Sequence, residues 1–267
     1  MRLARTIRER IEAGGSVLGT WHTLIHPYVT ELIARSGVDA VVIDQEHGPV
    51  DLEATAAATV ILQAYGVAAF VRVPWNDPVH IKRVLDIGVD GLMVPNVRSA
   101  DEARAAVAAC RYPPKGGRGI ALGAVRAGAY GADSDAYQAD LDDTLFLMLQ
   151  IESVAGVEAI PEIAAVYGVA MLFIGPNDLS GDMGLPRRMD DPAVRAMIHR
   201  AERAIVESAA WLGSIPSLGR DVPAMVAAGC DFVCAGAELP MLRDGLAALV
   251  AGARGAATNG APGGERA

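Results

Sequence analysis

The sequence lacks several features that would define whole classes of protein. Lysine is almost absent, since Lys82 and Lys115 are the only two in 267 residues. The formal net charge is -9 and the arginines are scattered, so no basic patch is available for a phosphate backbone. A GxGxxG segment after the first expected strand and a GxxxxGK[ST] segment are both missing, which removes support for dinucleotide-binding and P-loop folds. Because the chain is acidic and its arginines are scattered, we expect no nucleic-acid partner.

Cysteine is also scarce. Cys110, Cys230 and Cys234 are odd in number, and none of their spacings is CxxC. We expect them to be buried free thiols in a protein of the reducing cytoplasm.

Long apolar runs are limited as well. The N-terminal segment has no apolar core and carries two glutamates, which argues against a secretory signal, and Leu3, Ile7 and Ile11 instead line one face of a short helix. The longest apolar stretch, residues 54–71, is interrupted by polar residues and Gly66. It predicts a helix followed by a strand, so we expect no membrane span.

What the chain does contain is a regular alternation of strand-like and helix-like segments. The predicted strands are residues 17–24, 40–47, 68–73, 91–97, 145–153, 170–177, 211–216 and 231–237. The predicted helices are residues 27–37, 52–66, 78–88, 100–110, 155–168, 192–209, 221–229 and 239–252. Eight such units in about 250 residues predict an α/β fold, a (β/α)8 TIM barrel. We expect one domain over residues 1–252, with a short N-terminal helix, and a disordered tail of small polar residues over 253–267.

Polar residues interrupt the apolar runs where strands end, which is where a barrel of this kind places its active site. These residues are Trp21, His22, Asp44, Glu46, His47, Arg72, Gln150, Glu152, Asn177 and Asp178. Gln150 and Glu152 are two apart and therefore face the same side of their strand. Glu152 and Asp178 fall at equivalent places on neighbouring strands, and such a pair of carboxylates suits a hard divalent cation. The alternative is that Glu152 caps the next helix and Asp178 begins the next turn.

His47 and Arg72 are the candidates for moving protons and holding negative charge. Histidine is the side chain best suited to transfer protons near neutral pH, although a structural histidine bonded to Asp44 is the alternative. A buried Arg72 needs an anion, which is either a substrate oxygen or the side chain of Glu46 or Asp44. The segment GPNDLS, residues 175–180, turns from strand into helix and would present backbone N–H groups to a carboxylate. The remaining histidines are expected on the surface or in packing: His22, His26, His80 and His199.

Six motifs in this order resemble the HpcH/HpaI aldolases, metal-dependent pyruvate aldolases that act on 4-hydroxy-2-oxo acids and 2-keto-3-deoxy sugar acids. The motifs are GTW, DQEHGP, VRVPWNDPVHIKRVLDIG, RYPPKGGRG, QIES and GPNDLS, and the resemblance covers roughly residues 17–252. It implies a pyruvate/phosphoenolpyruvate-type barrel. The chain departs from the usual pattern at Gln45 and Asn177 and in the pair His22 and His26, which affects the expected preference for acid and aldehyde.

The resemblance implies a role for each motif residue. His47 would accept a proton, Arg72 would stabilise an enolate, and Glu152 and Asp178 would bind Mg2+ or Mn2+, with Co2+ also compatible. The implied catalytic set also includes Asp44. Substrate contacts are expected from residues at the barrel mouth: Trp21, Gln150, Gly175, Pro176, Asn177 and Asp178.

The resemblance also implies that Asp86 raises the basicity of His47. Asp86 ends a helix just before the fourth strand, at the opposite end of its own barrel from the site. It would therefore reach His47 only from a neighbouring subunit. We expect a homo-oligomer, with a hexamer favoured because exchange of the last helix is typical of hexamers in the family.

The mechanism follows from charge. Cleaving the C3–C4 bond of a 4-hydroxy-2-oxo acid leaves a carbanion that must be held either through a lysine imine or as a metal-stabilised enolate. Neither Lys82, on a helix, nor Lys115, in a loop, ends an inner strand, which favours the metal route to pyruvate and an aldehyde. We expect Arg72→Ala to lower kcat and leave the fold intact.

Two alternative functions and the place of one segment stay open at this point. An acyl-CoA lyase of the citrate lyase β-subunit type would share the fold and the metal carboxylates, but the lysine-poor chain offers little for CoA phosphates. A non-catalytic protein that binds a metal and a 2-oxo acid would bind pyruvate without exchanging its methyl protons. Residues 116–123, GGRGIALG, are either a loop at the rim of the site or a plain connector.

Overall fold

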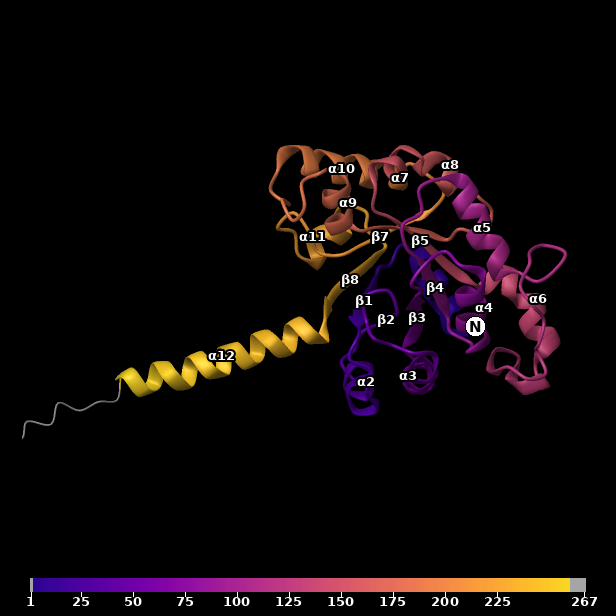
Figure 1. The fold of residues 1–267 in the computed structure, drawn as a ribbon, viewed down its shortest axis with the longest axis horizontal. Coiled ribbons are helices and arrows are strands. Elements are labelled where there is room, and N and C mark those ends of the chain that lie inside the picture. The colour runs from indigo at the N-terminus through magenta and orange to yellow at the C-terminus, as the bar shows by residue number, and fades with distance from the viewer. Residues whose placement is uncertain (1, 260–267) are drawn as a thin grey trace, which may run out of the picture.

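The computed structural model describes residues 2–259. Eight parallel strands close into a barrel in chain order, from β1 beside β2 round to β8 beside β1. The strands are β1 (Val17–His22), β2 (Ala40–Asp44), β3 (Ala68–Arg72), β4 (Gly91–Val94), β5 (Phe146–Ile151), β6 (Met171–Ile174), β7 (Trp211–Ser214) and β8 (Phe232–Ala237). The predicted (β/α)8 barrel and its eight strands are confirmed (Figure 1).

Helices connect the strands and surround much of the barrel. They are α1 (Arg2–Glu12), α2 (Pro27–Ala34), α3 (Leu52–Ala64), α4 (Pro78–Asp86), α5 (Ala100–Cys110), η1 (Arg126–Gly131), α6 (Ser134–Thr144), α7 (Val154–Glu158), α8 (Ile160–Ala164), α9 (Pro176–Asp182), α10 (Pro192–Val206), α11 (Val222–Ala227) and α12 (Glu238–Asn259). The predicted helices omit η1, α6 and α9, although the segment GPNDLS was expected to turn from strand into helix where α9 begins. The segment predicted as one helix over residues 155–168 divides into α7 and α8, and Pro161 stands in the first turn of α8.

The connection from α3 to β3 shows how local sequence defines these elements. Asp51 caps α3 by accepting a hydrogen bond from the Ala54 N–H group at 2.8 Å. Gly66, with φ of 76°, follows the last turn in a conformation that favours glycine. The apolar stretch over residues 54–71 is therefore a helix and a strand, as predicted.

The barrel interior is a packed apolar core. Phe70 meets Phe146 and Phe232 edge to face, with ring centroids 5.4 and 5.8 Å apart. Helix α1 closes the end of the barrel where the strands begin, because its buried Ile7 and Ile11 join this interior cluster. The predicted apolar face of the N-terminal helix is confirmed.

Helix α12 leaves the barrel instead of covering it (Figure 1). It is helical to Asn259, so the expectation that a disordered tail begins at residue 253 is wrong for residues 253–259. An alanine-rich segment, ARGAATN, continues the helix there because alanine is the strongest helix former. Residues 260–267 lie outside the described part. Within residues 2–259, no helix combines the length and apolar character that a membrane span requires.

Candidate active site

A layer of polar side chains lies above the apolar interior at the carboxyl ends of the strands. Side chains alternate along a strand, so Gln150 and Glu152 continue the inward row of Phe146 and Met148. On the neighbouring side of the barrel, Arg72 continues the row of Phe70, and its register partner is Asp44 on β2. The structure brings these four predicted residues together at the barrel mouth.

Arg72 is at the centre of this layer and is 6% exposed. Its Nε and Nη2 atoms donate to Asp44 Oδ1 and Oδ2 at 2.9 and 2.6 Å, a bidentate pair. Its Nη1 atom lies 2.9 Å from Glu46 Oε2 and 3.5 Å from Gln150 Oε1. Burial lowers the pKa of Arg72, but the bonds and charge of Asp44 and the charge of Glu46 outweigh it and raise the pKa. The guanidinium is therefore a fixed, fully charged donor.

These contacts change one expectation from the sequence. Asp44 is 3% exposed and has Arg72 as its counter-charge. Removing that guanidinium leaves a buried carboxylate unpaired, which is strongly destabilising. Arg72→Ala would therefore lower the free energy of unfolding as well as kcat.

Three carboxylates interact across the site: Glu46, Glu152 and Asp178. Burial is the main cause that raises the pKa of Glu152 to about 7, and the charges of Asp178 and Glu46 add to it. Burial also raises the pKa of Glu46, opposed by the charge of Arg72. Asp178, on α9, is exposed at the mouth. The site therefore holds an excess of negative charge that a cation would offset.

The donor set fits a hard divalent cation. Glu152 Oε1 accepts a hydrogen bond from the Asn96 N–H group at 2.8 Å, whereas the buried Oε2 atom has no hydrogen-bond partner. A buried carboxylate oxygen without a donor is costly unless a ligand or ion completes its contacts. The cap of α7 is Ser153, so Glu152 is not the helix cap that was the alternative. Among residues 2–259 no three metal-ligating side chains form a cage, so a cation held by two carboxylates keeps open positions for substrate oxygens.

His47 and Asp86 are placed very differently. The His47 side chain is 63% exposed, with Nε2 3.9 Å from Glu46 Oε2. Only its backbone N–H group donates to Asp44, at 3.3 Å, so it is not the structural histidine bonded to Asp44. Asp86 ends α4 and accepts a hydrogen bond from the buried Arg118 at 2.7 Å, at the other end of the barrel. The structure does not bring Asp86 to His47 within one chain.

The remaining predicted residues surround this cluster. The Trp21 ring centroid lies 4.4 Å from the Arg72 guanidinium carbon. Gly175 is buried against Glu152, because a Cβ there would lie 2.5 Å from Glu152 Oε2 and 2.9 Å from Gln150 Nε2. Pro176 is buried and Asn177 is exposed.

Several other residues named from the sequence lie at the opposite end or on the outside of the barrel. Gln45 points to α3, where its Nε2 atom donates to Thr55 Oγ1 at 2.8 Å, so this departure from the family pattern does not enter the site. Lys82 lies on α4, and the exposed Lys115 pairs with Asp142, so both lie away from the polar layer. Residues 116–123 lie between α5 and η1, where Arg118 pairs with Asp86 at the far end of the barrel, so they are a connector within this barrel and not a rim of its site.

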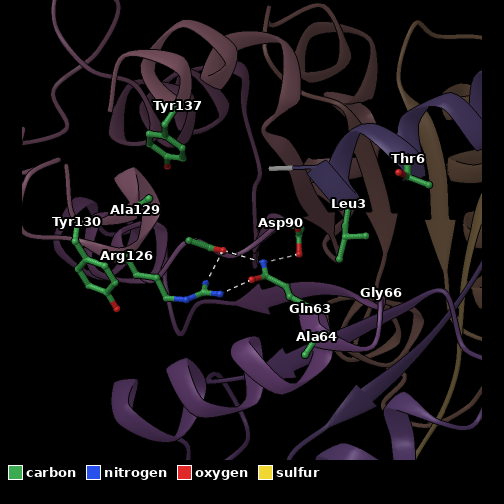
Figure 2. Close-up of a pocket in the computed structure, with 12 residues that line it drawn as sticks. Leu3, Thr6, Gln63, Ala64, Gly66, Asp90, Arg126, Ala129, Tyr130 and Tyr137 are labelled. Atoms are coloured by element: carbon green, nitrogen blue, oxygen red, sulfur yellow. Dashed lines mark hydrogen bonds between the residues drawn. The ribbon is translucent and has the colours of Figure 1, made fainter. Parts of the chain in front are cut away.

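A cavity of about 840 Å3 opens at the end where the strands begin (Figure 2). Gln63 links its polar wall, since Nε2 donates to Asp90 Oδ2 at 2.9 Å and Oε1 accepts from Arg126 at 2.7 Å. None of the predicted site residues lines this cavity. It is therefore separate from the polar layer at the barrel mouth.

Two side chains have contacts that sequence patterns did not predict. Glu46 was expected at the strand end and as an alternative partner for Arg72, but its interaction with Glu152 and Asp178 was not predicted. His22 was expected on the surface or in packing, and it is fully buried beside Glu238 at 3.2 Å. No local signal links His22 to Glu238, because they meet only when β8 pairs with β1.

Comparisons with known proteins agree with this architecture. A 4-hydroxy-2-oxo-heptane-1,7-dioate aldolase from Salmonella arizonae is 36% identical over 253 residues, covering 93% of this chain and 94% of that protein. A hydroxypyruvate/pyruvate aldolase from Roseovarius nubinhibens is 43% identical over 179 residues, 67% of this chain and 69% of that protein. These relatives are aldolases, which are carbon–carbon lyases.

A solved structure gives the same result for the fold. A HpcH/HpaI aldolase/citrate lyase family protein from Burkholderia cenocepacia superimposes with a TM-score of 0.86 at 30% identity, covering 95% of this chain and 99% of that one. Residues 18–241 match the sequence profile of the family described as HpcH/HpaI aldolase/citrate lyase. The chain therefore belongs to the HpcH/HpaI aldolase/citrate lyase family.

Proposed function

We propose that this site reversibly cleaves a 4-hydroxy-2-oxo acid, or a 2-keto-3-deoxy sugar acid, to pyruvate and an aldehyde with the help of a divalent cation. The observation that carries the proposal is the buried Arg72 donor beside three interacting carboxylates, one of which has an unpartnered buried oxygen. Named aldolases that match over nine-tenths of the chain support the same chemistry. Binding without catalysis would not require a fixed donor and a histidine at the same mouth.

Glu152 and Asp178 are the residues that would hold the cation. Their oxygen donors suit Mg2+ or Mn2+, and Co2+ is compatible with the same set. When bound, the cation supplies Lewis-acid polarisation of the 2-oxo group.

The chain's own residues provide the rest of the chemistry. Arg72 Nη1, which faces Glu46 and Gln150, would donate to the oxygen on which negative charge develops as the C3–C4 bond breaks. Asp44 holds the guanidinium in orientation through two hydrogen bonds, so the donor needs no rearrangement during the reaction. His47, exposed at the mouth, would take the proton of the 4-hydroxyl group.

The substrate would lie between Trp21, Gln150 and the segment from Gly175 to Asp178. Gly175 leaves space beside Glu152 that any side chain would fill. Asn177 is exposed within this segment. We propose that these residues orient the 2-oxo acid and that Asn177 contributes to the choice of aldehyde.

We also propose that the protein works as a homo-oligomer, with a hexamer favoured. Asp86 would complete the site only from a second copy, because its own chain places it beside Arg118. Helix α12 leaves its barrel with large apolar side chains exposed: Leu239, Met241, Leu242, Leu246, Leu249 and Val250. Exposed apolar side chains on a projecting helix favour burial against another subunit. Light scattering of the purified protein would give the number of copies.

The three cysteines support a cytoplasmic location, which we also propose. Cys110, Cys230 and Cys234 are free and buried. Burial raises the pKa of Cys110 and of Cys230 to about 12, so neither is a reactive thiolate.

The proposal is tested by following pyruvate release from 4-hydroxy-2-oxo acids. Protein treated with EDTA would be assayed with and without added Mg2+ or Mn2+, and lactate dehydrogenase would report pyruvate through NADH oxidation. We expect release that depends on the metal and is lost in Glu152→Gln. Release that persists in EDTA, or cleavage of CoA esters in its place, would contradict the proposal.

A further inference from the structure

Strands β1 and β8 close the barrel beside Trp21, and their pairing is irregular there. Gly19 pairs with Cys234 while Trp21 pairs with Ala237, so β8 contains one residue more than β1 in this stretch. Such bulges re-aim side chains near active sites. Gly236 lies in the bulge with φ of 128°, a conformation that favours glycine, and its carbonyl accepts a hydrogen bond from Thr20 Oγ1 at 3.1 Å.

Immediately after the bulge, Glu238 binds the loop that follows β1. Its Oε1 atom accepts hydrogen bonds from the Thr23 N–H group at 2.6 Å and from the Leu24 N–H group. His22 Nδ1 lies 3.2 Å from the same oxygen, and His22 Nε2 lies 2.8 Å from Thr30 Oγ1. The start of α12 is therefore tied to the end of β1 through one carboxylate.

The charge of Glu238 is well supported by these donors. Burial alone would raise its pKa, but the hydrogen bonds from His22 and from the Leu24 and Thr23 N–H groups lower it to about 2. The side chain is 12% exposed, so water replaces these contacts only if the loop moves. The Glu238 carboxylate therefore stays ionised and keeps its hydrogen bonds to the Thr23 and Leu24 N–H groups near neutral pH.

The loop held by Glu238 continues directly from Trp21. The Trp21 ring lies 4.4 Å from the Arg72 guanidinium and meets Phe173 edge to face with centroids 6.0 Å apart. A shift of residues 22–24 moves the backbone of Trp21 and hence the ring that packs on Arg72. Donors in an active site lose effect when they are displaced by a fraction of an ångström.

We propose that Glu238 is a positioning residue, which couples the start of α12 to Arg72 through Trp21. It touches neither substrate nor Arg72, and acts by holding the end of β1. The inference rests on the proposed function, because it assumes that Arg72 donates during the reaction. It makes turnover depend on how α12 leaves the barrel.

The test compares Glu238→Gln with Asp244→Asn, a change of the same kind at an exposed position on the same helix. The hydrogen-exchange rates of the Thr23 and Leu24 amides measure the strength of their hydrogen bonds to Glu238, independently of activity. Exchange of pyruvate methyl protons in D2O with Mn2+ reports kcat and KM, and light scattering reports the mass. For Glu238→Gln we expect the Thr23 and Leu24 amides to exchange about tenfold faster and kcat to fall about tenfold. We expect KM and the molecular mass to stay unchanged. Asp244→Asn should match the wild type.

Distinct outcomes separate the failure of this inference from failure of the proposed function. If the amides exchange faster while kcat stays at the wild-type value, or if the amides do not change, the positioning role is refuted. If Glu238→Gln does not fold, Glu238→Asp provides the comparison, because it keeps the negative charge on a shorter side chain. Its kcat should be lower, and its amide exchange faster, than in the wild type, by less than about tenfold. Wild-type values of kcat and amide exchange in Glu238→Asp would then refute the role. A wild-type protein that shows no metal-dependent methyl exchange refutes the proposed function itself.

Discussion

Replacing Arg72 with lysine separates the structural and catalytic roles of this residue. Lysine keeps the positive charge beside Asp44 and Glu46 but loses the bidentate geometry and the planar contact with Trp21. We expect the free energy of unfolding to fall by about 1.5–3 kcal/mol, the range for one hydrogen bond to a charged group. Arg72→Ala should cost about 3–5 kcal/mol, because Asp44 is left buried without a counter-charge.

The catalytic effect should be larger than the structural one. Loss of one fixed donor to a developing oxyanion lowers kcat by about 10² to 10³. We therefore expect kcat for pyruvate methyl exchange to fall about 10²-fold in Arg72→Lys, with KM changed by less than about threefold. Urea unfolding and NMR exchange on the same samples measure the two effects. The exposed Arg104, replaced by lysine, is the control. A folded Arg72→Lys enzyme with wild-type kcat would refute the assignment of Arg72 as the donor.

Three further predictions concern the carboxylates. Glu152→Gln should weaken Mn2+ binding by at least about tenfold in calorimetry, and unchanged affinity would exclude Glu152 as a ligand. The same change should leave the free energy of unfolding unchanged, because burial already raises the pKa of Glu152 to about 7 and the site accepts a neutral side chain. Gly175→Ala should displace Glu152, since the added Cβ would lie 2.5 Å from its Oε2 atom, and wild-type Mn2+ affinity would contradict this. The pKa of Glu238 is lowered from 4.5 to about 2, so its contribution to stability is complete above pH 4.5 and is lost as the pH falls through 2. In urea unfolding, the stability difference between wild type and Glu238→Gln should therefore be larger at pH 7 than at pH 3; a difference that grows in acid would contradict it.

Much of the fold follows from local sequence, because most strands are short apolar runs and several helices, such as α3, α4 and α11, end just before a glycine. The predicted strand over residues 40–47 ends at Asp44, since the polar residues after it form the loop that carries Glu46 and His47. Helix α6 was not predicted because its sequence, SDAYQADLDDT, is mostly polar and has few apolar residues to mark a face.

The site was predictable where strand periodicity and topology were sufficient. The spacing of Gln150 and Glu152, together with parallel strands in chain order, brings them to the same mouth as Arg72 and Asp44. The pairing of His22 with Glu238 was not predictable, because it depends on barrel closure and on a bulge in β8. The stability role of Arg72 also required the structure, since the burial of Asp44 and its bidentate pairing with Arg72 are seen only there.

Exchange of pyruvate methyl protons in D2O is the decisive measurement for metal-dependent enolate formation at this site, because it requires the proposed enolate chemistry and no aldehyde. EDTA-treated protein would be followed by NMR before and after addition of Mg2+ or Mn2+. We expect no exchange in EDTA, and rapid exchange with metal that is lost in Glu152→Gln and slowed in Arg72→Lys. Absence of exchange with every metal, in a folded protein that binds pyruvate, would contradict it.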